Sequence, residues 1–356
     1  MKSENWGSEQ MPSLTPFQRV MSLLRGEQPD RVPVIPQITY TTAQITGVGL
    51  VEALHSPEKT AEALLAGQRE LGYDAIYVGW ESSFNLLAEA MGCTMRFPED
   101  SVPQVADHIV KSPNDIDKVV IPDPQSSGRL PLHMEMVKLV KDAVDGDVPL
   151  FAYTPGPFTL AGQIAGVNAL MVATIQNPEF VSTLLNLTTK ASIRYALANV
   201  EAGVNVIVTA DPTASGSLIS PKTFATFAAP HLTQVAKAVT QVGSIASLHI
   251  CGKTAMILDQ MASTEVQILE LDHLVDMQEA QERIGQQVIL MGNLNPTELL
   301  LNGTPAEVEA AAKWCIETVG QDGRFILSSG CEVPPLTPLS NIRAMVAAAE
   351  KYGRFS

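Results

Sequence analysis

The stretch SIASLHICG at residues 244–252 decides how the fold of this chain is interpreted. It is a short apolar run that ends at a glycine, a pattern typical of a buried β-strand. Side chains two positions apart in a strand point to the same side, so His249 and Cys251 can bind one ion together. A second such run, FILSSGC at 325–331, ends at Cys331. One imidazole and two thiolates suit zinc, and three protein ligands leave the fourth position open, as in catalytic zinc sites.

Similar apolar runs recur along the chain and predict eight strands. They are almost continuously apolar, as expected for strands that are buried on both faces of a parallel sheet. The predicted strands cover residues 32–38, 75–79, 148–154, 204–210, 244–250, 266–272, 287–293 and 324–330.

Helices are predicted between these strands. The segments 220–243, 304–320 and 337–353 each begin with a Ser or Thr cap followed by Pro and end at a Gly. Strands that alternate with helices indicate a parallel α/β sheet, and eight strands close naturally into a (β/α)8 TIM barrel. A doubly wound open sheet is the alternative, but the GxGxxG motif that usually accompanies it is missing.

The domain organisation is predicted to be simple. Residues 1–14 form a polar lead-in, and residues 15–356 form a single barrel domain with an N-terminal helical extension. The segment from about 80 to 147, between the second and third strands, is longer than one crossover helix requires. Its Pro, Gly and Asp content predicts an enlarged excursion with short strands or loops.

Composition and charge exclude several classes of protein. The formal net charge of −15 disfavours binding to nucleic acid and to anionic membranes. No apolar run approaches the roughly 18 residues that span a bilayer. The four cysteines contain no CxxC pair, and the absence of an apolar signal segment predicts a reducing, cytoplasmic location. Of these cysteines, Cys93 and Cys315 are expected to be ordinary loop or core residues.

Barrel topology and the metal hypothesis support each other. Active sites of barrels lie at the C-terminal ends of the strands. His249 and Cys251 end the fifth predicted strand and Cys331 follows the eighth, so in a closed barrel all three reach the same rim. The sequence CGKT at 251–254 resembles the end of a phosphate loop, but that motif requires Gly where Ser247 stands.

Other polar side chains are predicted to reach this rim from the strand ends. For each of them the alternative role is support of a neighbouring group or capping of a helix. We assign Glu81 and Asp211 to catalysis and Tyr153, Asn293 and Glu332 to substrate binding. Further candidates at the strand ends are Thr154, Glu270, Asp272 and Asn295.

Several motifs together resemble the uroporphyrinogen decarboxylase superfamily from about residue 15 to the C-terminus. Within it, the His-x-Cys motif followed much later by Gly-Cys resembles the zinc-dependent methylcobamide:coenzyme M methyltransferases. The ligands of that family correspond to His249, Cys251 and Cys331 here. The motifs are TPFQRVMSLLRGEQPDRVPVIP, TPGPFTLAG, DPTASGSLISPKTF, LHICGKT, MGNLNP and SSGCEVPPLTPLSNIRAMVAAAEKYG.

The resemblance implies a zinc-dependent methyltransferase that moves a methyl group between a methylated corrinoid and a thiol such as coenzyme M. Demethylation of a methoxy, methylamine or methylthio substrate onto a corrinoid, and tetrapyrrole decarboxylation, remain alternatives; a non-enzymatic metal-binding or corrinoid-chaperone protein is a further one. The decarboxylases carry an RQAGR element after the first strand, whereas the segment here, IPQITYTTAQITG, contains no arginine.

The implied mechanism needs a partner protein. A thiol in the open metal position would lose its proton and attack the methyl group of the corrinoid. The DxHxxG signature of corrinoid binding is absent, so the corrinoid is expected on a separate carrier protein. A small thiol is the other substrate, and the chain is expected to be a monomer or a homodimer. Lys253 is the nearest cation in sequence for a substrate that carries a sulfonate.

Overall fold

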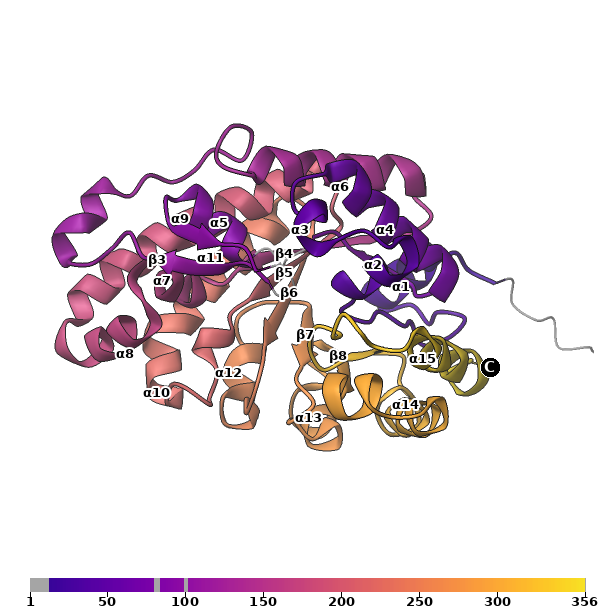
Figure 1. The fold of residues 1–356 in the computed structure, drawn as a ribbon. Helices are drawn as coiled ribbons and strands as arrows, with labels where there is room; N and C mark the ends of the chain where they lie inside the picture. Colours follow the sequence, from indigo (N-terminus) through magenta and orange to yellow (C-terminus); the bar gives the residue numbers. More distant parts are fainter. Residues whose placement is uncertain (1–12, 80–83, 99–101, 356) are drawn as a thin grey trace, which may run out of the picture.

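The structure is a computed structural model that describes residues 13–79, 84–98 and 102–355. Its centre is a parallel sheet of seven strands in the order β1-β4-β5-β6-β7-β8-β9, which curls on itself with helices around the outside (Figure 1). Strands of this sheet that follow one another in sequence are therefore neighbours in space. The strands are β1 (Ile76–Tyr77), β4 (Leu150–Pro155), β5 (Val206–Ala210), β6 (Ile245–Ile250), β7 (Ile268–Leu271), β8 (Ile289–Leu294) and β9 (Phe325–Ser329).

The predicted first strand closes the barrel without forming a regular strand. Val34 makes an isolated parallel bridge with Leu327 of β9. On its other side, the Val34 carbonyl accepts a hydrogen bond of 2.7 Å from the backbone of Asp74, just before β1. The prediction of a full strand over 32–38 is wrong because Pro33 and Pro36 lack the N–H groups that a ladder needs. The closed (β/α)8 arrangement is confirmed, with this segment in the first position.

Helices alternate with the strands as predicted. Two predicted segments differ in detail. A π-helical stretch, Phe224–Ala228, interrupts the segment 220–243 between two α-helices. The last helix begins at Leu339, with Pro338 and not Thr337 at the cap position. The helices are α1 (Pro16–Leu24), α2 (Ala43–Thr46), α3 (Leu50–Ala53), α4 (Pro57–Leu71), α5 (Phe84–Ala90), α6 (Leu130–Val144), α7 (Pro157–Ala165), α8 (Val167–Gln176), α9 (Pro178–Ala202), α10 (Pro221–Thr223), α11 (Ala229–Gln241), α12 (Leu258–Ala262), α13 (Met277–Ile284), α14 (Pro305–Val319) and α15 (Leu339–Tyr352).

The excursion between the second and third barrel positions is present. It contains α5, an antiparallel pair made by β2 (Thr94–Arg96) and β3 (Gln104–Asp107), and the long helix α6. The prediction of an enlarged segment is therefore confirmed. Glu81, predicted to be catalytic, falls at its start, in the stretch 80–83 that lies outside the described residues.

The inside of the barrel is a packed core. Inward-pointing side chains such as Phe151, Val208 and Ile326 form one buried cluster. Val20 and Leu23 of α1 belong to the same cluster, so the N-terminal helix packs against this barrel interior. A much larger cluster fills the space between the strands and the outer helices. The polar site is therefore confined to the ends of the strands.

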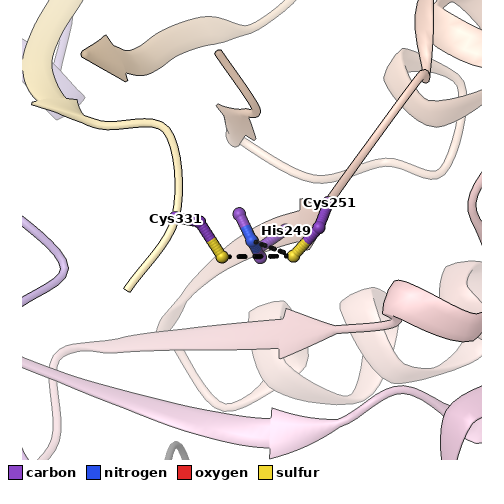
Figure 2. Close-up of side chains that lie close together, drawn as sticks. All are labelled: His249, Cys251 and Cys331. Atoms are coloured by element: carbon purple, nitrogen blue, oxygen red, sulfur yellow. Dashed lines mark hydrogen bonds between the residues drawn. The ribbon is translucent and has the colours of Figure 1, made fainter. Parts of the chain in front are cut away.

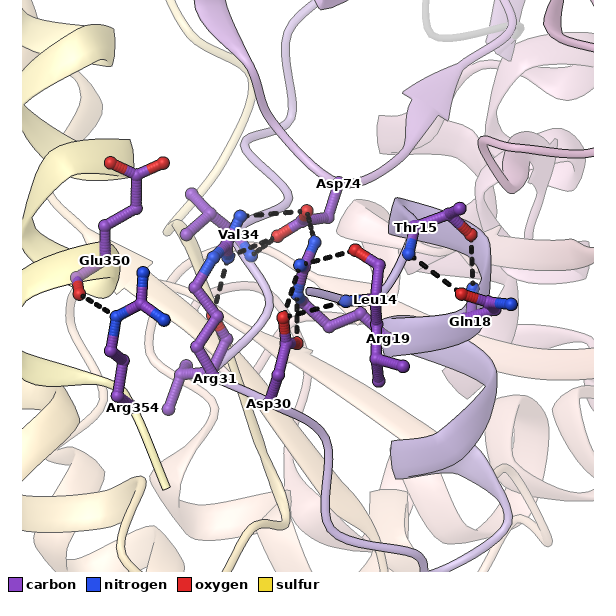
Figure 3. A network of polar contacts seen from close by, with 11 residues as sticks. Leu14, Thr15, Gln18, Arg19, Asp30, Arg31, Val34, Asp74, Glu350 and Arg354 are labelled. Atoms are coloured by element: carbon purple, nitrogen blue, oxygen red, sulfur yellow. Dashed lines mark hydrogen bonds and ion pairs between the residues drawn. The ribbon is translucent and has the colours of Figure 1, made fainter. Parts of the chain in front are cut away.

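A buried network of charges holds α1 at the N-terminal ends of the strands (Figure 3). Arg19 of α1 pairs with Asp30 and with Asp74, each at 2.7 Å. Arg31 pairs with Asp74 at 2.7 Å, and the same carboxylate accepts the backbone N–H of Val34 at 2.7 Å. Asp74 thus joins the N-terminal helix to the segment that closes the barrel.

No single helix in the described part of the chain is long and apolar enough to cross a bilayer. The pair α7 and α8 satisfies length and composition only when taken together, across a bend of 107°. The cytoplasmic location stays a prediction.

Candidate metal centre

Three ligand-type side chains meet at the C-terminal rim of the barrel, as the sequence predicts (Figure 2). His249 Nε2 lies 3.0 Å from Cys251 Sγ, and Cys251 Sγ lies 3.3 Å from Cys331 Sγ. The three ligand atoms all lie within 4.8 Å of one another. Within the described ranges no other group of three His, Cys, Asp or Glu side chains is arranged in this way. The ends of β6 and β9 therefore form one site.

The chain turn after Cys251 fixes the direction of its thiol. Gly252 follows with φ +87°, a left-handed conformation that side chains rarely adopt. A Cβ there would lie 2.7 Å from Ser217 Oγ, so the space for a side chain is also missing. The Gly252 N–H donates to the Asp272 carboxylate at 2.8 Å, which anchors the turn to the end of β7. Asp272, a candidate at a strand end, thus supports the position of Cys251.

The two thiols differ in their acidity. The hydrogen bond from Cys251, opposed by burial and helped by His249, lowers the pKa of Cys331 well below the ordinary thiol range. The same hydrogen bond, together with burial, raises the pKa of Cys251. One thiolate therefore forms readily in this pair. The second thiol needs a further positive charge nearby, such as a divalent cation, to lose its proton.

The far side of the His249 ring faces buried polar side chains. Nδ1 lies 3.4 Å from Gln37 Nε2 and 4.0 Å from Glu270 Oε2. Glu270 is held by hydrogen bonds from Ser247 at 2.8 Å and Tyr77 at 3.1 Å, and burial raises the pKa of its carboxyl group. Nε2 is therefore the ring nitrogen that faces the sulfur atoms. Groups behind a metal-binding histidine orient its ring in this way.

The orientation of Gln37 determines which nitrogen of His249 is free to bind an ion. A metal at Nε2 requires the ring proton to sit on Nδ1, and that N–H needs an acceptor. In the structure the Gln37 amide nitrogen lies toward the ring, and the amide oxygen accepts a hydrogen bond from the Tyr153 hydroxyl at 2.9 Å. The amide provides the acceptor for Nδ1 only when it is turned over, so that its oxygen faces the ring. The two amide orientations are distinguished by their hydrogen bonds alone.

Asp211, predicted to be catalytic, is fully buried and bonded to the backbone of α7. Its carboxylate accepts hydrogen bonds from the N–H groups of Thr159 at 2.6 Å and Phe158 at 3.3 Å. A Cβ at Gly156 would lie 2.3 Å from Asp211, so the close approach requires glycine there. Burial raises the pKa of Asp211 to about 6. This geometry favours the alternative role of capping a helix.

Of the residues predicted to bind substrate, Glu332 is next to a metal ligand in sequence, whereas Tyr153 contacts the site only through Gln37. Glu332 follows Cys331 directly. One of its carboxylate oxygens accepts from the N–H and the hydroxyl of Thr39, and the other is buried and has no hydrogen-bond partner among the described residues. Burial raises the pKa of Glu332 to about 8. Tyr153 reaches the site through Gln37, and its ring stacks on Tyr77 at 4.9 Å between centroids.

Asn293 holds a loop, and Asn295 caps a helical segment. The Asn293 amide donates to the carbonyls of Asp272 and Val275 and so holds the loop after β7. Asn295 caps the short helical segment Pro296–Leu301. Cys93 and Cys315 are buried, as expected for core residues.

Sequence reasoning missed Gln37, Tyr77 and Ser247 as parts of the site. None of them belongs to a motif with metal-ligand spacing. The available signal was the alternation within β6, which places Ser247 on the same side as His249. Parallel register then puts Glu270 of β7 beside His249. Gln37 could be found only from the closed barrel.

Comparisons with known proteins agree with this fold. A sequence model of the family "Uroporphyrinogen decarboxylase (URO-D)" matches residues 15–352. The chain is 33% identical over 348 residues to methylcobamide:CoM methyltransferase MtaA of Methanosarcina barkeri, covering 96% of this chain and 99% of that protein. It is 28% identical over 306 residues to uroporphyrinogen decarboxylase of Coxiella burnetii, covering 83% and 82%.

A solved structure described as a methyltransferase from Methanosarcina mazei is similar throughout. It has a TM-score of 0.87 and 33% identity, and the match covers 95% of this chain and 99% of that one. The predicted resemblance to the methylcobamide:coenzyme M methyltransferase branch and the prediction of an enzyme of the methyltransferase type are confirmed. The chain belongs to the uroporphyrinogen decarboxylase (URO-D) family.

Proposed function

We propose that the protein is a zinc-dependent methyltransferase that moves a methyl group between a corrinoid on a carrier protein and a small thiol. The observation that carries the proposal is the cluster of one imidazole and two sulfur atoms within 4.8 Å at the barrel rim. Similarity to a methylcobamide:CoM methyltransferase over 96% of the chain supports the same chemistry.

The donor set fits zinc. Thiolate and imidazole ligands suit a cation of intermediate softness, and the sulfur atoms of Cys251 and Cys331, 3.3 Å apart, are close enough to bind the same ion. His249, Cys251 and Cys331 would hold the ion and leave one position for a substrate. When bound there, zinc lowers the pKa of the substrate thiol, so the thiol reacts as thiolate.

The proposed transfer is balanced without another reactant. The substrate sulfur forms a bond to the methyl carbon, and the methyl–cobalt bond breaks with its electron pair left on cobalt. The thiol proton goes to solvent, and the products are a thioether and the reduced corrinoid. The same site serves the reverse reaction, in which a methylated substrate gives its methyl group to the corrinoid.

The protein side chains orient the reacting groups. Gln37 and Glu270 hold the His249 ring, and Asp272 holds the turn that carries Cys251. Of the residues predicted to meet the substrate, Glu332 supports this role best, because one of its carboxylate oxygens has no partner in the described part of the chain and the residue follows Cys331. Catalytic roles for Glu81 and Asp211 stay predictions; the contacts of Asp211 support a role in positioning α7.

Metal content and methyl transfer test the proposal together. Protein purified with zinc supplied is expected to retain about one ion per chain and to transfer methyl groups from free methylcobalamin to a thiol. His249→Ala and Cys331→Ala should lose both properties. Cys315→Ala removes a buried cysteine outside the site and is the matched control. Transfer that survives chelation and the loss of Cys331 would contradict the proposal.

A further inference from the structure

One residue, Gln37, contacts both of the strand ends that carry His249 and Cys331. Its side chain lies 3.4 Å from His249 Nδ1. Its main chain contacts the other strand end, because its N–H donates to the Ser329 hydroxyl at 3.0 Å and its carbonyl accepts from the Val333 N–H at 2.8 Å. The chain before and after Cys331 is therefore bonded to the residue that faces the imidazole.

Thr39, two residues further on, adds a second attachment next to Cys331. Its N–H and its hydroxyl both donate to one carboxylate oxygen of Glu332, at 3.0 Å and 2.5 Å. None of the Thr39 surface is exposed, so water cannot replace either donor. The side chain of Glu332 is thereby tied to the segment that also contacts His249, and the main chain of Glu332 continues directly from Cys331.

The third ligand, Cys251, is held from elsewhere in the barrel. Its turn is bonded through the Gly252 N–H to the Asp272 carboxylate at 2.8 Å, in the loop after β7. The two cysteines thus have different supports. A change at Thr39 should act on Cys331 and leave Cys251 in place.

We propose that Thr39 is a positioning residue for Cys331: through Glu332 it holds the Cys331 thiol toward the other two ligands. The inference rests on the proposed function, because it concerns a ligand of the same metal centre. Zinc sites tolerate deviations of only about 0.2 Å in the distance to each ligand. Since the site has three protein ligands, a poorly held Cys331 weakens all of it.

Removal of one hydroxyl group tests this role. Thr39→Val keeps the shape of the side chain but loses one of the two donors to Glu332. Zinc binding, measured by competition with a chelator, should therefore weaken about tenfold, the lower end of the effect of residues that support metal ligands. Thr39→Ser retains the hydroxyl and should recover most of the affinity.

Thr264→Val is the matched control for the loss of a buried hydrogen bond. Thr264 is equally buried, and its hydroxyl donates to the Met261 carbonyl at 2.7 Å, in the connection between α12 and β7. Thr264→Val should lower the stability of the protein as Thr39→Val does, but it should bind zinc like the unmodified protein. The comparison separates a general loss of stability from a loss of the position of Cys331.

Hydrogen exchange in the zinc-free protein tests the attachment without a metal. Residues 329–333 should exchange roughly threefold or more faster in Thr39→Val than in the unmodified protein, whereas exchange at residues 250–253 should not change. Unchanged zinc affinity or unchanged exchange at 329–333 in Thr39→Val would overturn the inference, and so would an equal loss of affinity in Thr264→Val. If the unmodified protein bound no zinc while exchange at 329–333 still rose in Thr39→Val, the proposed function would be contradicted and the attachment of this segment to Thr39 would stand.

Discussion

Buried polar groups are paired more completely at the N-terminal end of the barrel than at the C-terminal end. At the N-terminal ends of the strands, Asp74 is paired with Arg19 and Arg31 and also accepts a backbone N–H (Figure 3). At the C-terminal ends, Cys251 and Cys331 contact each other, and one oxygen of Glu332 has no partner among the residues that the structure describes. A satisfied network stabilises one structure, whereas an incompletely satisfied one is suited to receive a ligand. Stability and chemistry are therefore separated along the barrel axis.

The largest effect on folding is expected from Asp74→Ala. The substitution leaves two buried guanidinium groups without their shared carboxylate, which should lower the free energy of unfolding by about 3–5 kcal/mol. Denaturant unfolding measures this change. Glu70→Ala is the control, because its exposed pair with Arg343, at 3.6 Å, contributes about 0–1 kcal/mol. If Asp74→Ala lost zinc while its free energy of unfolding stayed unchanged, the separation of stability and chemistry between the two ends would be contradicted.

A pH-dependent effect of similar size is expected from His133, which belongs to neither end. Burial lowers its pKa to about 4, and it bonds to Asn199 at 2.8 Å. Between about pH 6.5 and pH 4 the unfolded chain binds a proton at this residue and the folded chain does not. The free energy of unfolding should therefore fall by up to about 3 kcal/mol as the pH falls through this range.

The variant His133→Gln isolates that contribution. It keeps a hydrogen-bond donor for Asn199 but has no titrating group, so its stability should depend less on pH between 6.5 and 4. Urea unfolding of both proteins at several pH values measures the difference, and effects shared by the two proteins cancel. Parallel curves for the two proteins would show that His133 titrates normally.

The smallest effect is expected from Gln37→Leu, and it is confined to the C-terminal end. Loss of the Gln37 amide, whose oxygen would accept from His249 Nδ1 when the amide is turned over, should weaken zinc binding by about 10–100-fold with little change in stability. Gln37→Glu keeps an acceptor and should recover most of the affinity. Competition with a chelator measures binding directly, and Gln68→Leu, which contacts Tyr73 instead, is the control. Equal zinc affinity in Gln37→Leu and the unmodified protein would remove Gln37 from the site.

The fold was largely predictable because buried parallel strands leave a strong pattern of apolar residues. The exception, residues 32–38, is apolar but contains Pro33 and Pro36, and the missing N–H groups limit it to one bridge. The trio of His249, Cys251 and Cys331 was predictable because residue type and spacing carry the chemistry.

The residues that surround and orient His249, Cys251 and Cys331 were not predictable in the same way. Gln37 and Tyr77 are ordinary polar residues whose role arises only when side chains from different strands converge inside the closed barrel. Asp211 shows the opposite difficulty. A carboxylate at a strand end suggests catalysis, but its oxygen atoms accept hydrogen bonds from backbone N–H groups at the N-terminus of α7.

The central claim is that His249, Cys251 and Cys331 hold a zinc ion with one position open for a thiol. X-ray absorption spectroscopy at the zinc edge tests it most directly. We expect one imidazole nitrogen and two sulfur atoms in the free protein, with Zn–S distances of about 2.3 Å. A third sulfur is expected after addition of a thiol substrate. A zinc ion without sulfur ligands, or a sulfur count that does not change with the thiol, would contradict the account.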